Sequence, residues 1–115
     1  MTSIAPLLPE CFLNRPIAHR ALHNVSEGRP ENSRVAIMAA IAAGYGIEID
    51  LQLSRDGTAM VFHDYDLGRL TGETGLVRDR DESNLGQIVL SGGQEGVPSL
   101  VQVLELVAGR VPLLI

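Results

Sequence analysis

The sequence predicts an α/β domain built on a parallel sheet. Short apolar runs with the period of a β-strand alternate along the chain with segments that have the period and the caps of an α-helix. The predicted order is strand, helix, strand, hairpin, helix and strand, which is typical of domains that place helices on a parallel sheet. With 115 residues, of which 45% are hydrophobic, the chain makes one domain at most and has enough apolar side chains for a core.

A lead-in precedes the predicted elements. We expect residues 1–14 to be loosely structured, because prolines and a glutamate interrupt their apolar positions. The apolar residues of this lead-in that are available to fill the core are Leu7, Leu8, Phe12 and Leu13. No basic region precedes them, so the sequence predicts no signal peptide.

The first strand and the first helix are predicted next. Residues 16–20 read Pro-Ile-Ala-His-Arg, a short buried strand that ends in two polar residues. Residues 30–33, Pro-Glu-Asn-Ser, are typical of a helix start, with Asn32 or Ser33 as the N-cap. The many alanines of this helix allow close packing on a sheet, and Gly44 is its predicted left-handed C-cap.

A hairpin is predicted over residues 46–64. Apolar and polar residues alternate over residues 47–53, which is the period of a strand, and a second strand covers residues 59–62. The Asp-Gly pair at 56–57 is a strong turn signal. The connection is too short for a parallel crossover, so the two strands are predicted to be antiparallel.

The length of this loop decides which polar side chains meet. The strand period sends Glu48 and Asp50 to one face. If the loop has two residues, Asp50 faces His63 across the ladder and the three side chains share that face. A three-residue loop turns His63 to the other face.

An insertion and a second helix are predicted in the last third of the chain. Residues 65–96 are mostly polar and rich in turns, and they are long enough to be an insertion or lid rather than a connector. A short helical turn is expected around residues 83–88. Ser99 and Gln102 form a predicted capping box at the start of the second helix, which Gly109 closes.

The chain finishes in an apolar run. Residues 111–115 read as a buried strand, which needs neighbours on both sides. We therefore expect residues 15–115 to be the N-terminal part of a larger domain, truncated at its third sheet strand. An unpaired strand edge of this kind also favours self-association.

The charge balance excludes several classes of partner and mechanism. A net charge of -5 argues against nucleic acid or another polyanion as partner. All nine basic residues are arginines, so lysine-based Schiff bases and nucleophiles are excluded, while bidentate phosphate binding stays available. No apolar run approaches the ~18 residues of a transmembrane helix. The lone Cys11 indicates a reducing compartment, and we expect a cytoplasmic protein.

Polar residues suited to cleaving a phosphate ester are predicted at one rim of the sheet. His19 and Arg20 end the first strand. Glu48, Asp50 and His63 are expected at the same rim, where carboxylates can hold Mg²⁺ or Ca²⁺ and two imidazoles can share acid and base duties. Zinc is the lesser option, because the chain has neither HExxH nor CxxC. Taken singly, each carboxylate is more often an ordinary exposed position of a half-solvated sheet.

A series of short motifs covers most of the chain. The motifs are Ala-His-Arg at 18–20, Pro-Glu-Asn-Ser at 30–33, Glu-Ile-Asp at 48–50, Asp-Gly at 56–57, Val-Phe-His-Asp at 61–64, Leu-Gly-Arg-Leu-Thr-Gly at 67–72 and Val-Pro-Ser-Leu at 97–100. Their order and content resemble the N-terminal part of the glycerophosphodiester phosphodiesterase family. Each motif alone is weak, whereas the series is specific. One departure is Ala21, which stands where the family usually has glycine.

The resemblance implies a fold and an activity. The fold is a partial TIM-type (β/α) barrel, with roughly the first three barrel strands, a β-hairpin and two main helices. The activity is hydrolysis of a small-molecule glycerophosphodiester to glycerol 3-phosphate and an alcohol, within lipid and glycerol metabolism. Residues 65–96 match the family's insertion, which helps to shape the glycerol pocket.

The resemblance also implies roles for single residues. His19 and His63 are the catalytic acid/base pair, and Arg20 binds the substrate phosphate. Glu48 and Asp50 are ligands of Mg²⁺ or Ca²⁺, and a third carboxylate ligand is expected just beyond Ile115.

Other functions stay open at this point. One is a non-catalytic remnant that binds a metal or a protein partner through its open edge, and another is a metal-dependent barrel enzyme with a non-phosphate substrate. Because the chain supplies two of three expected carboxylates and half of a pocket, we predict that the 115-residue chain alone has no useful activity.

Overall fold

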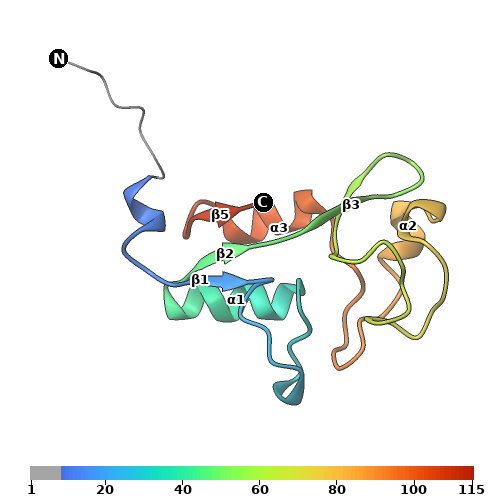
Figure 1. The fold of residues 1–115 in the computed structure, drawn as a ribbon, viewed down its shortest axis with the longest axis horizontal. Helices are drawn as coiled ribbons and strands as arrows, with labels where there is room; N and C mark the ends of the chain where they lie inside the picture. Colours follow the sequence, from blue (N-terminus) through green and yellow to red (C-terminus); the bar gives the residue numbers. More distant parts are fainter. Residues whose placement is uncertain (1–8) are drawn as a thin grey trace.

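A parallel three-stranded sheet organises the first half of the chain. A computed structural model describes residues 9–115. The sheet has the order β1-β2-β5 and contains β1 (Ile17–His19), β2 (Gly46–Glu48) and β5 (Leu113–Leu114). Both strand pairs are parallel, and β2 lies between its neighbours (Figure 1). The predicted α/β architecture with a parallel sheet is therefore confirmed.

Helix α1 lies between β1 and β2, and helix α3 directly precedes β5. In α1 (Arg34–Ala43), the Ser33 hydroxyl accepts a hydrogen bond from the Ala36 amide, and Gly44 ends the helix with a φ of 73°. In α3 (Leu100–Val107), Ser99 and Gln102 form the predicted capping box. The left-handed C-cap of α3 is Ala108, one residue before the predicted Gly109.

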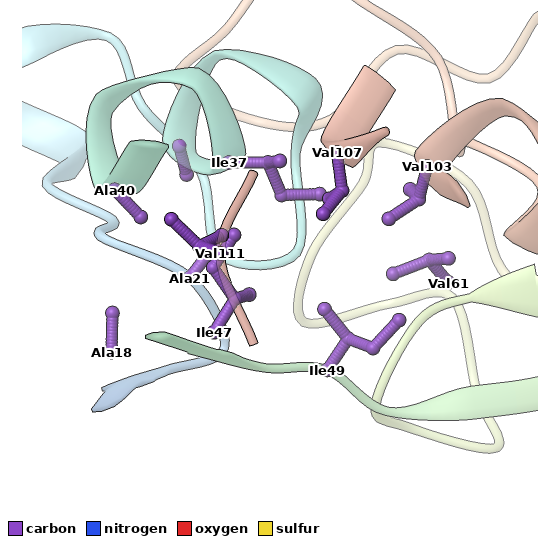
Figure 2. Packing of buried hydrophobic residues seen from close by; sticks show 11 residues of the cluster. Ala18, Ala21, Ile37, Ala40, Ile47, Ile49, Val61, Val103, Val107 and Val111 are labelled. Carbon is purple, nitrogen blue, oxygen red and sulfur yellow. The ribbon is translucent and has the colours of Figure 1, made fainter. Parts of the chain in front are cut away.

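The main core lies between the sheet and the two helices. Figure 2 shows Ile47 and Ile49 pointing toward side chains of α1 and α3, with Val61 of the hairpin beside Val103. The buried residues of this main core are Ala18, Ala21, Ala36, Ile37, Ala40, Ile47, Ile49, Val61, Val103, Val107 and Val111. Small alanine side chains bring α1 close to the sheet, as the sequence predicts.

The hairpin extends from one end of β2, and its strands form a separate sheet. It consists of β3 (Leu51–Leu53) and β4 (Ala59–Val61), which pair antiparallel as predicted. The single strand predicted over residues 47–53 is wrong, because it breaks between β2 and β3. The Ile49 amide still donates to Leu114 of the parallel sheet, whereas the Asp50 carbonyl accepts from Phe62 of the hairpin. The chain changes partner at this point, so one continuous ladder is impossible.

The hairpin loop has three residues. Ser54 donates to the Thr58 carbonyl at 2.9 Å, which closes the loop over residues 55–57, and Leu53 pairs with Ala59. The two-residue alternative, with Asp50 directly opposite His63, is therefore wrong. Asp50 instead lies opposite Phe62.

Residues 65–96 pack around a core of their own. They contain the 3₁₀-helix η3 (Val77–Asp79) and the short helix α2 (Glu82–Leu85), and they lie beyond the hairpin in Figure 1. A second cluster of buried side chains joins this segment to the hairpin and to the chain before α3: Met60, Phe62, Leu67, Val77, Leu85, Ile88, Leu90 and Val97. We call it the insertion core.

Two further 3₁₀-helices lie near the start of the chain, η1 (Glu10–Phe12) and η2 (Val25–Glu27). Of the apolar residues predicted in the lead-in, Phe12 is half-buried and Leu13 is exposed, while Leu7 and Leu8 lie outside the described residues. Over residues 9–115, every helix is too short to cross a membrane.

Candidate active site

The carboxyl ends of β1 and β2 bring the first predicted residues together. The parallel register places His19 beside Glu48, with the His19 side chain exposed at the rim of the sheet. Carboxyl ends of parallel strands are where α/β proteins bind ligands, since the loops that follow are free to carry polar groups. The pairing of β1 with β2 is therefore sufficient to make His19 and Glu48 neighbours, whatever their function.

Arg20 lies between three carboxylates. Its backbone amide donates to Oε1 of Glu48 at 3.0 Å, and its Nη1 donates to Oε2 of Glu31 at 3.1 Å. Its Nε lies 3.7 Å from Oδ2 of Asp50. This Nε is buried and makes no hydrogen bond within the described part of the chain. The guanidinium therefore has a donor left for an anionic ligand.

Asp50 is held by the turn that precedes α1. The Asn32 amide group donates to Oδ2 of Asp50 at 3.2 Å, and the Asp50 amide donates to Oδ1 of Asn32 at 3.4 Å. This pairing fixes Asp50 where the chain leaves the parallel sheet for the hairpin. Asn32 has a φ of 56°, so its own backbone is held in the left-handed region to make the contact.

The two carboxylates form an oxygen donor set for a hard cation. Oε2 of Glu48 and Oδ1 of Asp50 accept no hydrogen bond from residues 9–115, so each carboxylate has an oxygen available. Carboxylate oxygens are what Mg²⁺ and Ca²⁺ prefer, and Mg²⁺ commonly keeps water in its remaining positions. The described residues contain no cluster of three or more His, Cys, Asp or Glu side chains that could enclose an ion. The donor chemistry fits a divalent ion, while two carboxylates leave most of its coordination to other groups.

His63 reaches the site indirectly. Its side chain is exposed, and Nδ1 lies 2.7 Å from Oδ1 of the adjacent Asp64. The His63 carbonyl accepts a hydrogen bond from Nε2 of Gln52 at 2.9 Å, which ties it to the hairpin. Among the described residues, the imidazole makes no hydrogen bond or ion pair with His19, Glu48 or Asp50. The structure thus does not place His63 against the other predicted residues directly.

Arg69 links His63 to the rest of the site. It donates to both oxygens of Asp64, each at 2.9 Å, and to both oxygens of Glu31, at 2.9 and 3.1 Å. Glu31 in turn accepts from Arg20. A continuous series of contacts between alternating charges therefore runs from Asp50 through Arg20, Glu31, Arg69 and Asp64 to His63.

The arginines shift the protonation of the two linking carboxylates. Burial acts to raise the pKa of Glu31, but the hydrogen bonds and charges of Arg69 and Arg20 together outweigh it and hold the pKa below its ordinary value. The hydrogen bonds from Arg69 hold the pKa of Asp64 well below its usual range, against a smaller opposing effect of burial. Both carboxylates are consequently ionised at neutral pH.

Sequence reasoning missed four residues of this network. The sequence pattern predicts Glu31 and Asn32 only as part of a helix start, and it predicts no role for Asp64 and Arg69 within their motifs. The available signal was that all four lie inside the short motifs at 30–33, 61–64 and 67–72. Two of their contacts, Asn32 with Asp50 and Arg69 with Glu31, span 18 and 38 positions of sequence, which no local pattern reveals.

An apolar groove adjoins the site at the hairpin. It has a volume of about 840 Å³ and is lined by Leu51, Gln52, Leu53, Ala59, Tyr65, Leu76 and Arg78. None of the predicted catalytic, phosphate-binding or metal-binding residues lines it. Gln52 connects the two, because it lines the groove and also donates to His63.

Comparison with known proteins gives one consistent result. The model of the glycerophosphoryl diester phosphodiesterase family matches residues 19–113. A glycerophosphodiester phosphodiesterase of Bacillus altitudinis is 37% identical over 105 residues, which cover 85% of this chain and 42% of the relative. A second relative with that name, from Caldanaerobacter subterraneus, is 35% identical over 101 residues. The chain spans about two fifths of the length of these curated relatives.

Solved structures agree with the sequence comparison. A glycerophosphodiester phosphodiesterase of Agrobacterium tumefaciens superimposes with a TM-score of 0.76 at 30% identity, over 86% of this chain and 45% of that chain. A phosphodiesterase of Oleispira antarctica, solved with its product sn-glycerol-3-phosphate, gives a TM-score of 0.75 at 31% identity, over 90% of this chain and 44% of that chain. The fold is therefore a partial TIM-type (β/α) barrel, as the sequence predicts.

Proposed function

The chain belongs to the glycerophosphoryl diester phosphodiesterase family, and from this premise we propose that it forms part of the active site of a metal-dependent phosphodiester hydrolase. The reaction is glycerophosphodiester plus water to glycerol 3-phosphate plus an alcohol. Water adds to phosphorus, the bond from phosphorus to the alcohol oxygen breaks, and the alcohol leaves with a proton. The activity belongs to the full-length domain, because this chain spans about two fifths of its relatives.

Each predicted residue has a task in this reaction. Arg20 binds the phosphodiester, and its Nε, which makes no hydrogen bond within residues 9–115, supports this role because a buried donor gains most from a hydrogen bond to an anionic oxygen. His19 and His63 are the acid/base pair: one accepts a proton from the attacking water and the other protonates the departing alcohol. Imidazoles suit both tasks because their ordinary pKa lies near neutrality.

Glu48 and Asp50 are the residues that would hold Mg²⁺ or Ca²⁺. When bound, such a cation supplies positive charge that stabilises the anionic phosphorus centre. The chain itself prepares the two carboxylates by fixing one oxygen of each, Glu48 through the Arg20 amide and Asp50 through Asn32. Pre-oriented ligands reduce the entropy that is lost on metal binding.

One observation carries the proposal. The residue that carries phosphate-binding chemistry, Arg20, contacts both predicted metal ligands at the carboxyl ends of β1 and β2. A surface salt bridge would explain one such contact. It does not explain a guanidinium beside Asp50 and Glu31 together with an Nε that makes no hydrogen bond in the described part of the chain.

Binding to the chain itself is the first test. We expect Mg²⁺ or Ca²⁺ to raise the midpoint of thermal unfolding, because a ligand of the native state stabilises it. Addition of sn-glycerol 3-phosphate should raise it further. Glu48→Gln and Asp50→Asn should abolish the metal effect, whereas Glu105→Gln, an exposed position on α3, should preserve it. A metal effect equal in all these variants would contradict the assignment.

A chimera tests the chemistry. Residues 15–115 would replace the matching segment of the Bacillus altitudinis relative, and release of glycerol 3-phosphate from glycerophosphocholine would be measured. We expect His19→Ala and His63→Ala each to lower kcat by about 10²-fold or more, which is typical for loss of an acid or base. His23→Ala is the matched control, since His23 is exposed in a loop. Unchanged turnover in both His19→Ala and His63→Ala would contradict the assignment of these residues as the acid/base pair.

The 115-residue chain alone should not turn over substrate. The same glycerophosphocholine assay with the purified chain and Mg²⁺ or Ca²⁺ checks this expectation. Release of glycerol 3-phosphate that disappears in His19→Ala would refute it. Metal binding without turnover in both the chain and the chimera would favour a non-catalytic remnant instead.

A further inference from the structure

Arg69 uses its guanidinium in an unusual way. It forms two bidentate pairs at once, one with Asp64 and one with Glu31, through four hydrogen bonds of 2.9–3.1 Å. A guanidinium has five N–H donors in a rigid plane, so this arrangement occupies most of them and fixes the orientation of both carboxylates. Arg69 therefore makes more hydrogen bonds, to more carboxylates, than a single ion pair at a surface would provide.

The two carboxylates lead to different parts of the site. Asp64 contacts Nδ1 of His63, and Glu31, whose side chain is 10% exposed, also contacts Arg20. Arg69 comes from residues 65–96, whereas Glu31 precedes α1 and Asp64 follows β4. Three separate segments of the chain therefore meet at this one guanidinium.

The contact with Asp64 has a chemical consequence for His63. Because the pKa of Asp64 is held well below its usual range, Asp64 is ionised at neutral pH and can only accept hydrogen bonds. Neutral His63 must then carry its proton on Nδ1, which leaves Nε2 with a free lone pair. Free imidazole prefers the opposite tautomer, with the proton on Nε2, so the contact reverses the intrinsic preference.

We propose that Arg69 is a positioning residue that acts on His63 through Asp64 and keeps its Nε2 available as a base, while Glu31 fixes this unit relative to Arg20. The relevance to catalysis rests on the function proposed above for His63 and Arg20. The effect of Arg69 on the tautomer of His63 does not depend on that function, because it follows from the contacts of Arg69 with Asp64 and Glu31 in the chain by itself.

The planar shape of arginine is essential to this role. A lysine ammonium keeps the charge, but its donors all lie on one nitrogen. It therefore cannot form bidentate hydrogen bonds with two carboxylates at the same time. Arg69 and Asp64 are partly solvated, and charge attraction alone would be weak there. The proposal therefore predicts that geometry matters more than charge at position 69.

The test is the tautomer of His63 in the ¹⁵N-labelled 115-residue chain. Long-range ¹H–¹⁵N correlation of the imidazole at about pH 8 distinguishes the two neutral tautomers. We expect the Nδ1–H form to dominate at His63 and the ordinary Nε2–H preference at His23, an exposed internal reference. Arg69→Met should lower the ratio of Nδ1–H to Nε2–H at His63 by about fivefold, the loss expected when a charged hydrogen bond weakens.

Two further variants separate geometry from charge. Arg69→Lys should fall close to Arg69→Met, and Arg78→Met should match the unmodified chain, because Arg78 is exposed and forms no ion pair in residues 9–115. A dominant Nε2–H form of His63 in the unmodified chain overturns the proposal. This measurement does not depend on whether any variant folds. An unchanged ratio in Arg69→Met, or full retention in Arg69→Lys, overturns it as well.

Failure of this proposal is distinguishable from failure of the proposed function. The tautomer is measured without metal, substrate or turnover. If His63→Ala is harmless in the chimera while the tautomer is as expected, the catalytic role fails and the positioning stands. If the tautomer is wrong while His63→Ala abolishes turnover, the opposite holds.

Discussion

Backbone strain is concentrated beside the candidate active site. Arg20, Ala21 and Asn32 have φ angles of 57°, 66° and 56°, in the left-handed region that L-residues usually avoid. Ala21 follows Arg20 directly, and Asn32 orients Asp50. Strain of this kind persists only where surrounding contacts hold it, and here the hydrogen bonds to Glu48 and Asp50 do so.

Ala21 gives a stability prediction. Its methyl group is buried, so Ala21→Gly relieves roughly 1–2 kcal/mol of strain but loses about 1 kcal/mol of burial and adds flexibility to the unfolded chain. These effects nearly cancel, and we expect a change within about 1 kcal/mol. Ala21→Val should destabilise by about 2–4 kcal/mol, because a β-branched residue is strained at this φ and overpacks the core.

Urea unfolding of the two Ala21 variants measures both effects. Equal stability of Ala21→Val and the unmodified chain would show that the backbone at this position is not left-handed. Ala42→Val, at an exposed position on α1, is the control for the added methyl groups.

The carboxylates of Glu31 and Asp64 give a pH prediction. Their pKa values are lower in the folded chain than in the unfolded one, so the unfolded state binds more protons in acid. Their stabilisation is complete above the ordinary carboxyl pKa of about 4 and is lost as pH falls. The free energy of unfolding should therefore decrease from about pH 5 downward.

Arg69→Met should flatten this decrease, because it removes a main cause of both shifts. Unfolding by urea between pH 7 and pH 3 provides the measurement, with Arg78→Met as the control. An acid dependence that is identical in the unmodified chain and in Arg69→Met would contradict this origin.

Single residues were predictable from the sequence only where the pattern is local. The side-by-side placement of His19 and Glu48 follows from two strand ends, and it is present in the structure. The position of His63 was not predictable, since it depends on whether the loop has two or three residues. Arg69 could not be found at all, because its partners are set by how residues 65–96 fold back over the site.

At the level of elements, helix α1 depends on a residue far away in sequence. Glu95 accepts hydrogen bonds from the backbone amides of Arg34 and Val35 and from Nε of Arg34. Together with Ser33, it satisfies the first turn of α1 and places a negative charge at the positive end of the helix. The segment that precedes α3 thereby fixes the start of α1.

Glu95→Gln should destabilise the chain by about 1–2 kcal/mol. The amide retains one acceptor oxygen and loses the charge that favours the helix start. Denaturant unfolding checks this, with Glu105→Gln as the control because Glu105 is exposed on α3. A loss as large in the control as in Glu95→Gln would rule out capping as the cause.

Sequence patterns predicted helices better than strands. Ser33, Gly44 and the Ser99–Gln102 capping box act locally, so they define α1 and α3 almost to the residue. The alternation over residues 47–53 was misleading, because it continues across Asp50 although the hydrogen-bonding partner changes there. The alternation of apolar and polar residues indicates which face of a strand is buried, but it does not indicate which strand pairs with it.

At the level of the whole molecule, the sheet has open edges. Within residues 9–115, β1 and β5 each pair on one side only, and Leu114 and Ile115 of the β5 end are exposed. Open apolar edges promote pairing between copies, and a charge on such an edge opposes it.

We expect the chain to associate as its concentration rises and Leu114→Lys to reduce this association. Sedimentation velocity at several concentrations measures it, and Leu104→Lys on exposed α3 surface is the control for added charge. A monomer at all concentrations would contradict the expectation.

Strand β4 and the residue that follows it contribute to both cores. Met60 and Phe62 point into the insertion core, whereas Val61 between them points into the main core (Figure 2). A recombination experiment that exchanged residues 65–96 alone would cut through a packed interior and leave Met60 and Phe62 facing foreign side chains. The interchangeable module of this protein therefore begins at Leu51, includes the hairpin and ends before Ser99. Leu51 and Val61 must be retained in such an exchange, because both pack on the main core.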